Sequence, residues 1–250
     1  GYAKKTQQYG DKGRVTEIAY FDMDGNLISP NLWKAAKKVT LRNKSGQGIK
    51  ETLFAANNKP EKFGIREMTY DENDLRTSLA FVDINGALIF NKDKGYAQWK
   101  RVYDGNGKII ERAYYKAKDE LVSYRNCYAK MTRDYDNNDR LIKESFFGID
   151  GKVGYSAGCL EGRNFDVKGK AFYSSFNITY DSSGNEIEIV YSGVGGKSIA
   201  DNYQIGKVTY SYDKNGNEIE RDFSGTKQSV LKLLEDYRKK GGSTKRRRRI

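Results

Sequence analysis

Residues 180–185, Tyr-Asp-Ser-Ser-Gly-Asn, and residues 212–217, Tyr-Asp-Lys-Asn-Gly-Asn, are two copies of the signal that decides the fold of this chain. In each copy, a tyrosine and an aspartate precede a short polar run that ends in glycine, which adopts positive φ at no steric cost. A type I turn followed by a bulge needs such a residue to reverse the chain between two strands. Each copy therefore predicts the turn of a β-hairpin.

The same signal recurs along the chain with intervals of 33, 28, 33, 32, 45 and 32 residues. The first residue of each copy, which we call the anchor, is one of Tyr9, Arg42, Tyr70, Tyr103, Tyr135, Tyr180 and Tyr212. Residues suited to positive φ stand four positions after the anchors: Gly13, Gly46, Asp74, Gly107, Asp139, Gly184 and Gly216. A second turn signal follows sixteen positions after the anchors: Gly25, Asn58, Gly86, Asp119, Gly151 and Gly196.

The residues between the turns alternate as strands do. Positions 7, 9 and 11 after the anchor share one face of a strand and are largely apolar, as in Ile187, Ile189 and Tyr191. One such unit cannot bury its apolar face alone, so neighbouring units must stack. The chain is therefore predicted to be all-β over residues 1–223, with about seven tandem hairpin units, of roughly 32 residues each, and an insertion near 151–170. They form an elongated single-layer meander or a solenoid, and the 19 tyrosines favour the meander.

The C-terminal part breaks the pattern. Val230, Leu233, Leu234 and Tyr237 have the spacing of one helical stripe, which predicts an α-helix over residues 224–240. This helix would cap the last unit, or alternatively dock another protein. Residues 241–250 are predicted to form a flexible basic tail.

Charge is concentrated in that tail. The net charge is +12, from 45 basic and 33 acidic residues, and eight of the basic residues lie in 238–250, which holds no acid. The run Lys245, Arg246, Arg247, Arg248 and Arg249 could bind nucleic acid, an anionic membrane or another anionic polymer, serve as a nuclear address or a basic processing site, or be a solvated end.

The turn signature at residues 212–217 resembles the YD repeats of bacterial Rhs-type proteins. Residues 21–26, Phe-Asp-Met-Asp-Gly-Asn, are similar to the hairpin turns of MORN-type repeats. Both resemblances rest on a few turn residues in each unit of residues 1–223. They imply a β-hairpin array with a structural or binding role, and they supply no catalytic residue.

Several kinds of chemistry are disfavoured. The chain has no histidine, which excludes Ser-His-Asp and Cys-His catalysis. Cys127 and Cys159 occupy equivalent repeat positions, so they are within disulfide reach in a solenoid and too far apart in a meander. The acidic run at residues 134–139 lacks the glycine and glutamate of an EF-hand loop and is explained by turn chemistry. No enzyme activity, metal or cofactor is expected, and no stretch is apolar enough to span a membrane.

The leading hypothesis is a non-catalytic repeat module that presents an extended surface for protein or glycan binding. The chain opens on Gly-Tyr-Ala, a tripeptide that recurs at residues 95–97, so it is expected to be a fragment of a larger bacterial or phage-like protein whose compartment is unknown. Exposed aromatic residues near the unit junctions would carry the binding, with packing as their alternative role: Tyr96, Trp99, Tyr128, Tyr155, Tyr173 and Tyr203. The second hypothesis is a nucleic-acid or anionic-polymer binder that uses the basic tail.

Overall fold

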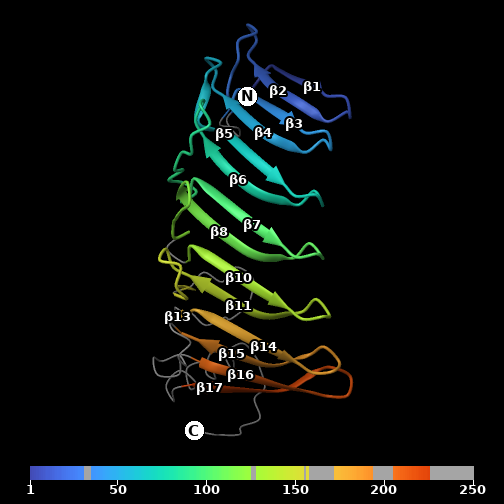
Figure 1. Ribbon diagram of the computed structural model, residues 1–250. Coiled ribbons are helices and arrows are strands. Elements are labelled where there is room, and N and C mark those ends of the chain that lie inside the picture. Colours follow the sequence, from blue (N-terminus) through green and yellow to red (C-terminus); the bar gives the residue numbers. More distant parts are fainter. Residues whose placement is uncertain (31–34, 125–127, 155, 158–171, 194–204, 226–250) are drawn as a thin grey trace. The chain divides into compact units, whose positions relative to one another are not determined.

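The computed structural model describes residues 1–30, 35–124, 128–154, 156–157, 172–193 and 205–225. Those residues are all β, with no helix among them. The chain divides into two compact units, Gly1–Val122 and Ser123–Ile250, and each is an open antiparallel meander of consecutive hairpins (Figure 1). The predicted all-β meander is confirmed, and its antiparallel pairing excludes the solenoid.

In the first unit, strands β1 to β8 pair in chain order, and β9 pairs with β8. The strands are β1 (Lys4–Tyr9), β2 (Val15–Phe21), β3 (Lys37–Arg42), β4 (Gly48–Phe54), β5 (Pro60–Tyr70), β6 (Arg76–Val82), β7 (Gln98–Tyr103), β8 (Ile109–Ala117) and β9 (Glu120–Leu121).

In the second unit, the sheet runs in the order β10, β11, β14, β15, β16, β17, while β12 and β13 form a separate two-stranded pair. The strands are β10 (Lys130–Tyr135), β11 (Leu141–Phe147), β12 (Ser156–Ala157), β13 (Phe172–Tyr173), β14 (Ser175–Tyr180), β15 (Glu186–Ser192), β16 (Ile205–Tyr212) and β17 (Glu218–Gly225).

The turns lie where the repeat predicts them. Positive φ occurs four residues after every anchor, at Gly13, Gly46, Asp74, Gly107, Asp139, Gly184 and Gly216. It also occurs sixteen residues after five anchors, at Gly25, Asn58, Gly86, Asp119 and Gly151. Each first turn carries a register shift next to the anchor, as between Thr179 and Tyr180, which is the expected bulge.

Strands of neighbouring hairpins pair over fewer residues than the two strands within one hairpin. The register between β6 and β7 covers three residue pairs, from Ser78–Lys100 to Ala80–Gln98, and that between β11 and β14 also covers three. Within the hairpin β7–β8 the register spans all of β7. The strands of adjacent hairpins therefore separate toward the first turns.

A small residue stands immediately before the first strand of four hairpins, which begin with β3, β7, β10 and β14. Ala97 is an example: its N–H donates to the carbonyl of Tyr115, and its carbonyl accepts from the N–H of Phe81. Ala36 and Ser174 make both equivalent contacts, and the N–H of Ala129 donates to the carbonyl of Phe147. These four residues are 0–2% exposed, so the hairpins pack against one another where only small side chains fit.

Residues 224 and 225, the first two of the predicted helix, end strand β17 instead. The rest of the predicted helix, the basic tail and most of the insertion near 151–170 lie outside the described residues. Among the residues that are described, no helix reaches the length and hydropathy that a bilayer-spanning helix needs.

Candidate binding surface

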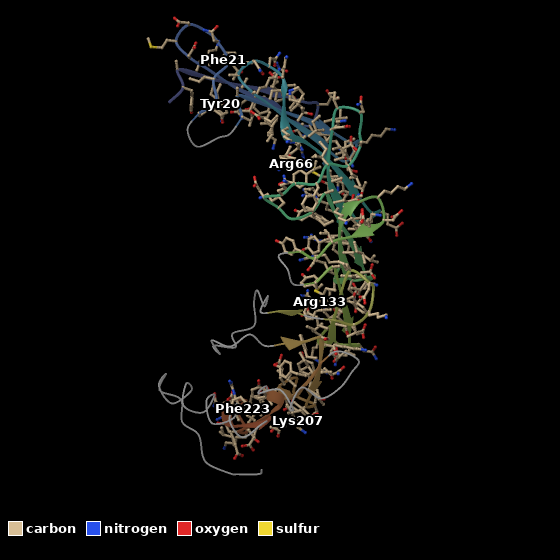
Figure 2. All side chains as sticks on the ribbon, turned by 90° about the vertical axis from the view of Figure 1, so that its left-hand side faces the viewer. Tyr20, Phe21, Arg66, Arg133, Lys207 and Phe223 are labelled. Carbon is tan, nitrogen blue, oxygen red and sulfur yellow. The ribbon has the colours of Figure 1, made fainter. Side chains whose placement is uncertain are left out.

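In each unit, one face of the sheet carries aromatic side chains at an equivalent repeat position, and we call it the aromatic face. These residues stand eleven positions after the anchors, on the second strand of each hairpin, and five of them are buried: Tyr20, Phe81, Tyr114, Phe146 and Tyr191. Phe223 occupies the same position in β17 and is half-buried. Because strand side chains alternate, Phe223 and Lys207, from the paired strands β17 and β16, lie on opposite faces (Figure 2).

Two of the aromatic residues predicted to bind a partner pack on the aromatic face. The ring of Tyr96 lies 5.8 Å from that of Phe81 and 5.4 Å from that of Tyr114, measured between centroids. The ring of Tyr128 lies 5.1 Å from that of Phe146. Both tyrosines are half-buried, so each ring combines a packing contact with some exposed surface.

Trp99 is buried, with 8% of its surface exposed. The guanidinium of Arg101 lies 4.2 Å from the centre of its ring, a cation–π contact. This leaves Trp99 with a packing role in the structure. The backbone of Tyr173 lies in β13, and its side chain is outside the described residues, as are Tyr155, Tyr203, Cys127, Cys159 and the run from Lys245 to Arg249.

The opposite face repeats a different pairing, in which a lysine covers an aromatic ring on the neighbouring strand. Lys37 lies 4.5 Å from the ring centre of Phe54, and Lys130 lies 4.8 Å from that of Phe147. Both pairs are directly opposite in their hairpins. The aliphatic stems and cationic heads of the two lysines therefore shield these rings from water.

The anchor tyrosines make a contact that their role as turn markers does not predict. The Tyr212 hydroxyl donates to the carbonyl of Glu186 at 2.8 Å, and the Tyr103 hydroxyl donates to that of Arg76 at 2.8 Å. Each acceptor stands six residues after the preceding anchor, where adjacent hairpins have separated. The same bond is made by Tyr70 to Gly48 and by Tyr180 to Leu141. We call this contact the anchor bond.

Arg42 replaces tyrosine at one anchor and still makes the anchor bond. Its Nη2 donates to the carbonyl of Val15 at 2.8 Å, and Val15 stands six residues after Tyr9. Its Nη1 also donates to the carbonyl of Gly46 in its own turn, at 3.0 Å. The only signal of the anchor bond in the sequence is therefore a donor-bearing side chain at a fixed position.

Five of the seven anchors are followed by an aspartate, and each of these carboxylates accepts hydrogen bonds within its own turn. Asp181 Oδ1 accepts from the backbone N–H groups of Ser183 and Asn185, and Oδ2 accepts from the Asn185 side chain. Hydrogen bonds to the charged form, chiefly from Asn185, hold the pKa of Asp181 below its ordinary value. The acidic run at residues 134–139 behaves alike, since Asp136 accepts from the backbone and side chain of Arg140. Within the described ranges, no three acidic or cysteine side chains gather as metal ligands.

Large apolar side chains stand at the tips of three second turns, a feature that sequence reasoning missed. Met23, Ile84 and Ile149 are 93%, 73% and 66% exposed. All three lie fourteen positions after an anchor, where the second repeat has Ala56 and the fourth has Ala117. Turn tips normally carry polar residues, so the signal that could have found these three is a large apolar residue between Asp or Gly and the positive-φ position.

Comparison with known proteins yields structural likeness alone. No family model and no curated protein matches the chain. It is similar to the crystal structure of TcdB2-TccC3-TEV, at 14% identity and a TM-score of 0.44, over 85% of this chain and 9% of that chain. It is also similar to the Photorhabdus luminescens Tc holotoxin pore, at 13% identity and a TM-score of 0.38, over 92% of this chain and 10% of that chain. The chain thus spans about a tenth of the structures that it matches.

Proposed function

We propose that this chain is a non-catalytic β-hairpin repeat module that presents an extended surface to a protein partner. The observation that carries the proposal is the exposure of Met23, Ile84 and Ile149 at equivalent turn positions. A single exposed apolar residue needs no explanation, but a large exposed apolar residue that recurs at one position of several turns favours a role in binding a partner. Tyr96 and Tyr128 would add partly exposed rings to the surface, and glycans are a second class of ligand that such rings suit.

The test compares two variants, each of which truncates two exposed apolar side chains. Met23→Ala with Ile84→Ala truncates two turn tips, and alanine is the residue that the chain itself has at this repeat position in Ala56. Leu41→Ala with Val102→Ala is the control, because these strand residues are 57% and 48% exposed and lie outside the second turns.

Each protein is immobilised and probed with a displayed peptide library and with a glycan panel. We expect the native chain to select peptides whose affinity falls at least tenfold in the turn-tip variant and stays unchanged in the control. Peptides that bind all three proteins equally would refute the turn tips as the contact. Binding of glycans alone would move the function to the tyrosine rings.

The second candidate is polyanion binding by Lys245–Arg249, which five consecutive positive charges favour. Its assay is binding of single- and double-stranded DNA at two salt concentrations, with and without residues 241–250. Tail-driven binding should weaken steeply with added salt and vanish on deletion. Binding that survives both changes would place the contact on the sheet.

A further inference from the structure

The structure assigns an anion-binding site to Arg101 and Arg112 on the aromatic face of the first unit, for a carboxylate or phosphate group. The two arginines are directly opposite each other in the hairpin β7–β8. Side chains in such a pair project from the same face with their Cβ atoms about 5 Å apart. Two like charges directly opposite each other destabilise the strand pair, and a bound negative charge would reduce their repulsion.

In each of the other hairpins, the two residues at the equivalent position do not carry like charges. Two are apolar, Met68–Leu79 and Ile178–Ile189, and Arg133–Glu144 is an ion pair. In the last hairpin, Arg221 lies over the ring of Tyr210 at 4.9 Å. The remaining pairs are Gln7–Ile18 and Thr40–Glu51. Of the seven described pairs, Arg101–Arg112 alone opposes two like charges.

The guanidinium groups lack partners for part of their hydrogen-bonding capacity. Both arginines are half-buried, and the Nε of each is buried without an acceptor among the described residues. Within the same described part of the chain, neither arginine has a carboxylate at salt-bridge distance, whereas Arg133 has Glu144. Burial of a charged donor without an acceptor is costly. An oxyanion that accepts from both guanidinium groups would satisfy these donors and offset the repulsion between the two arginines.

The surroundings strengthen the attraction for an anion. Arg101 is flanked on its own strand by the buried Trp99, over which it stacks, and by Tyr103. Arg112 is flanked by Ile110 and by the buried Tyr114. Glu111, beside Arg112 in sequence, lies on the other face of the strand because side chains alternate. Aromatic and aliphatic neighbours exclude water, and guanidinium forks match carboxylate and phosphate oxygens.

The stack on Trp99 provides the readout. The chain has two tryptophans, and Trp33→Phe leaves Trp99 as the sole tryptophan, which is excited selectively at wavelengths that tyrosine does not absorb. This protein is titrated with sodium phosphate, sodium sulfate and sodium acetate, each against sodium chloride at constant ionic strength. A short peptide rich in glutamate supplies a protein-borne carboxylate, so the responses separate a free oxyanion from an acidic segment. We expect a saturable change in Trp99 fluorescence with at least one oxyanion source and none with chloride.

Variants that copy the pairings of other hairpins decide the assignment. Arg112→Leu pairs the remaining arginine with an apolar neighbour, and Arg112→Glu reproduces Arg133–Glu144. Both should abolish the saturable response while retaining the native far-ultraviolet circular dichroism. Arg221→Leu is the matched control and should leave the response intact. The assignment is overturned if the native pair gives no saturable response to any source, or if a folded Arg112 variant keeps the response.

Discussion

Removing one anchor hydroxyl tests whether the anchor bond joins adjacent hairpins. In Tyr212→Phe, the carbonyl of Glu186 loses a donor that lies 2.8 Å away, while the ring and its packing remain. A neutral hydrogen bond contributes about 1 kcal/mol of net stability, and a half-buried carbonyl recovers part of that loss from water. We therefore expect the free energy of unfolding to fall by about 0.5–1.5 kcal/mol.

Tyr9→Phe is the control for the same chemical change. Tyr9 is an anchor, but it is 61% exposed, and its hydroxyl has no partner among the described residues. Its substitution should change stability by less than about 0.5 kcal/mol. The measurement is urea unfolding followed by tyrosine fluorescence and far-ultraviolet circular dichroism, with the slope compared between variants to check that the unfolded state is unchanged. Equal losses in Tyr212→Phe and Tyr9→Phe would refute the anchor bond as a stabilising contact.

Arg42 extends the test to a second kind of donor. Arg42→Tyr replaces the guanidinium with the residue used at the other anchors, so it should retain most of the stability. Arg42→Leu removes the three hydrogen bonds that Arg42 donates to Val15 and Gly46, so it should cost more stability than Tyr212→Phe. Arg14 still donates to the carbonyl of Gly46 in this variant. If Arg42→Tyr and Arg42→Leu are equally destabilised, the tyrosine geometry does not transfer between anchors.

Three further predictions concern the turns and junctions. Asp181→Asn keeps one accepting oxygen but loses the charge and the oxygen that accepts from the Asn185 side chain, so its urea midpoint should fall between those of the native chain and Asp181→Ala. Folding lowers the pKa of this carboxyl, so its contribution is present above about pH 4 and is lost as the pH falls through the folded pKa. Urea midpoints measured from pH 6 to 2 would show this loss in the native chain and not in Asp181→Ala. Ala97→Leu should lower the thermal midpoint through overpacking of about 1–3 kcal/mol, while Ala87→Leu on an exposed turn should leave it unchanged. Gly107→Ala should destabilise by about 1–2 kcal/mol because φ is +79° there, and Gly105→Ala, where a Cβ meets open space, should not.

The turns could be predicted from the sequence because they depend on local chemistry. A residue able to adopt positive φ, placed four positions after an anchor, determines the reversal whatever the rest of the chain does. Asp74 and Asp139 adopt φ of +63° and +64° at positions where other repeats have glycine, so the signal tolerates this exchange. Antiparallel hairpins then follow from the alternation between the turns, and the meander follows from pairing them in order.

The contacts between hairpins could not be predicted, because they depend on how neighbouring units separate. No sequence feature near an anchor tyrosine shows that its hydroxyl binds the preceding hairpin. In the sequence, Arg42 only departs from the tyrosine found at the other anchors. The exposure of individual side chains could not be predicted from the sequence either. Every residue of β4 is half-buried, so alternation along this strand does not separate core residues from solvent-facing residues. Trp99 and Tyr96 therefore read as surface candidates, although one is buried and the other is half-covered by neighbouring rings.

The anchor bond also explains why the repeats tolerate unequal lengths. Tyr70 and its acceptor Gly48 are 22 residues apart, whereas Tyr180 and Leu141 are 39 apart, and both pairs close at 3.0 Å. Lengthening a closed loop to this extent adds only about 0.5 kcal/mol of entropic cost. The short pair β12–β13 holds the base of the longer connection together. The connection between β11 and β14 is thus a suitable insertion site. A foreign peptide or a small domain could be inserted there without changing the register of the hairpins on either side.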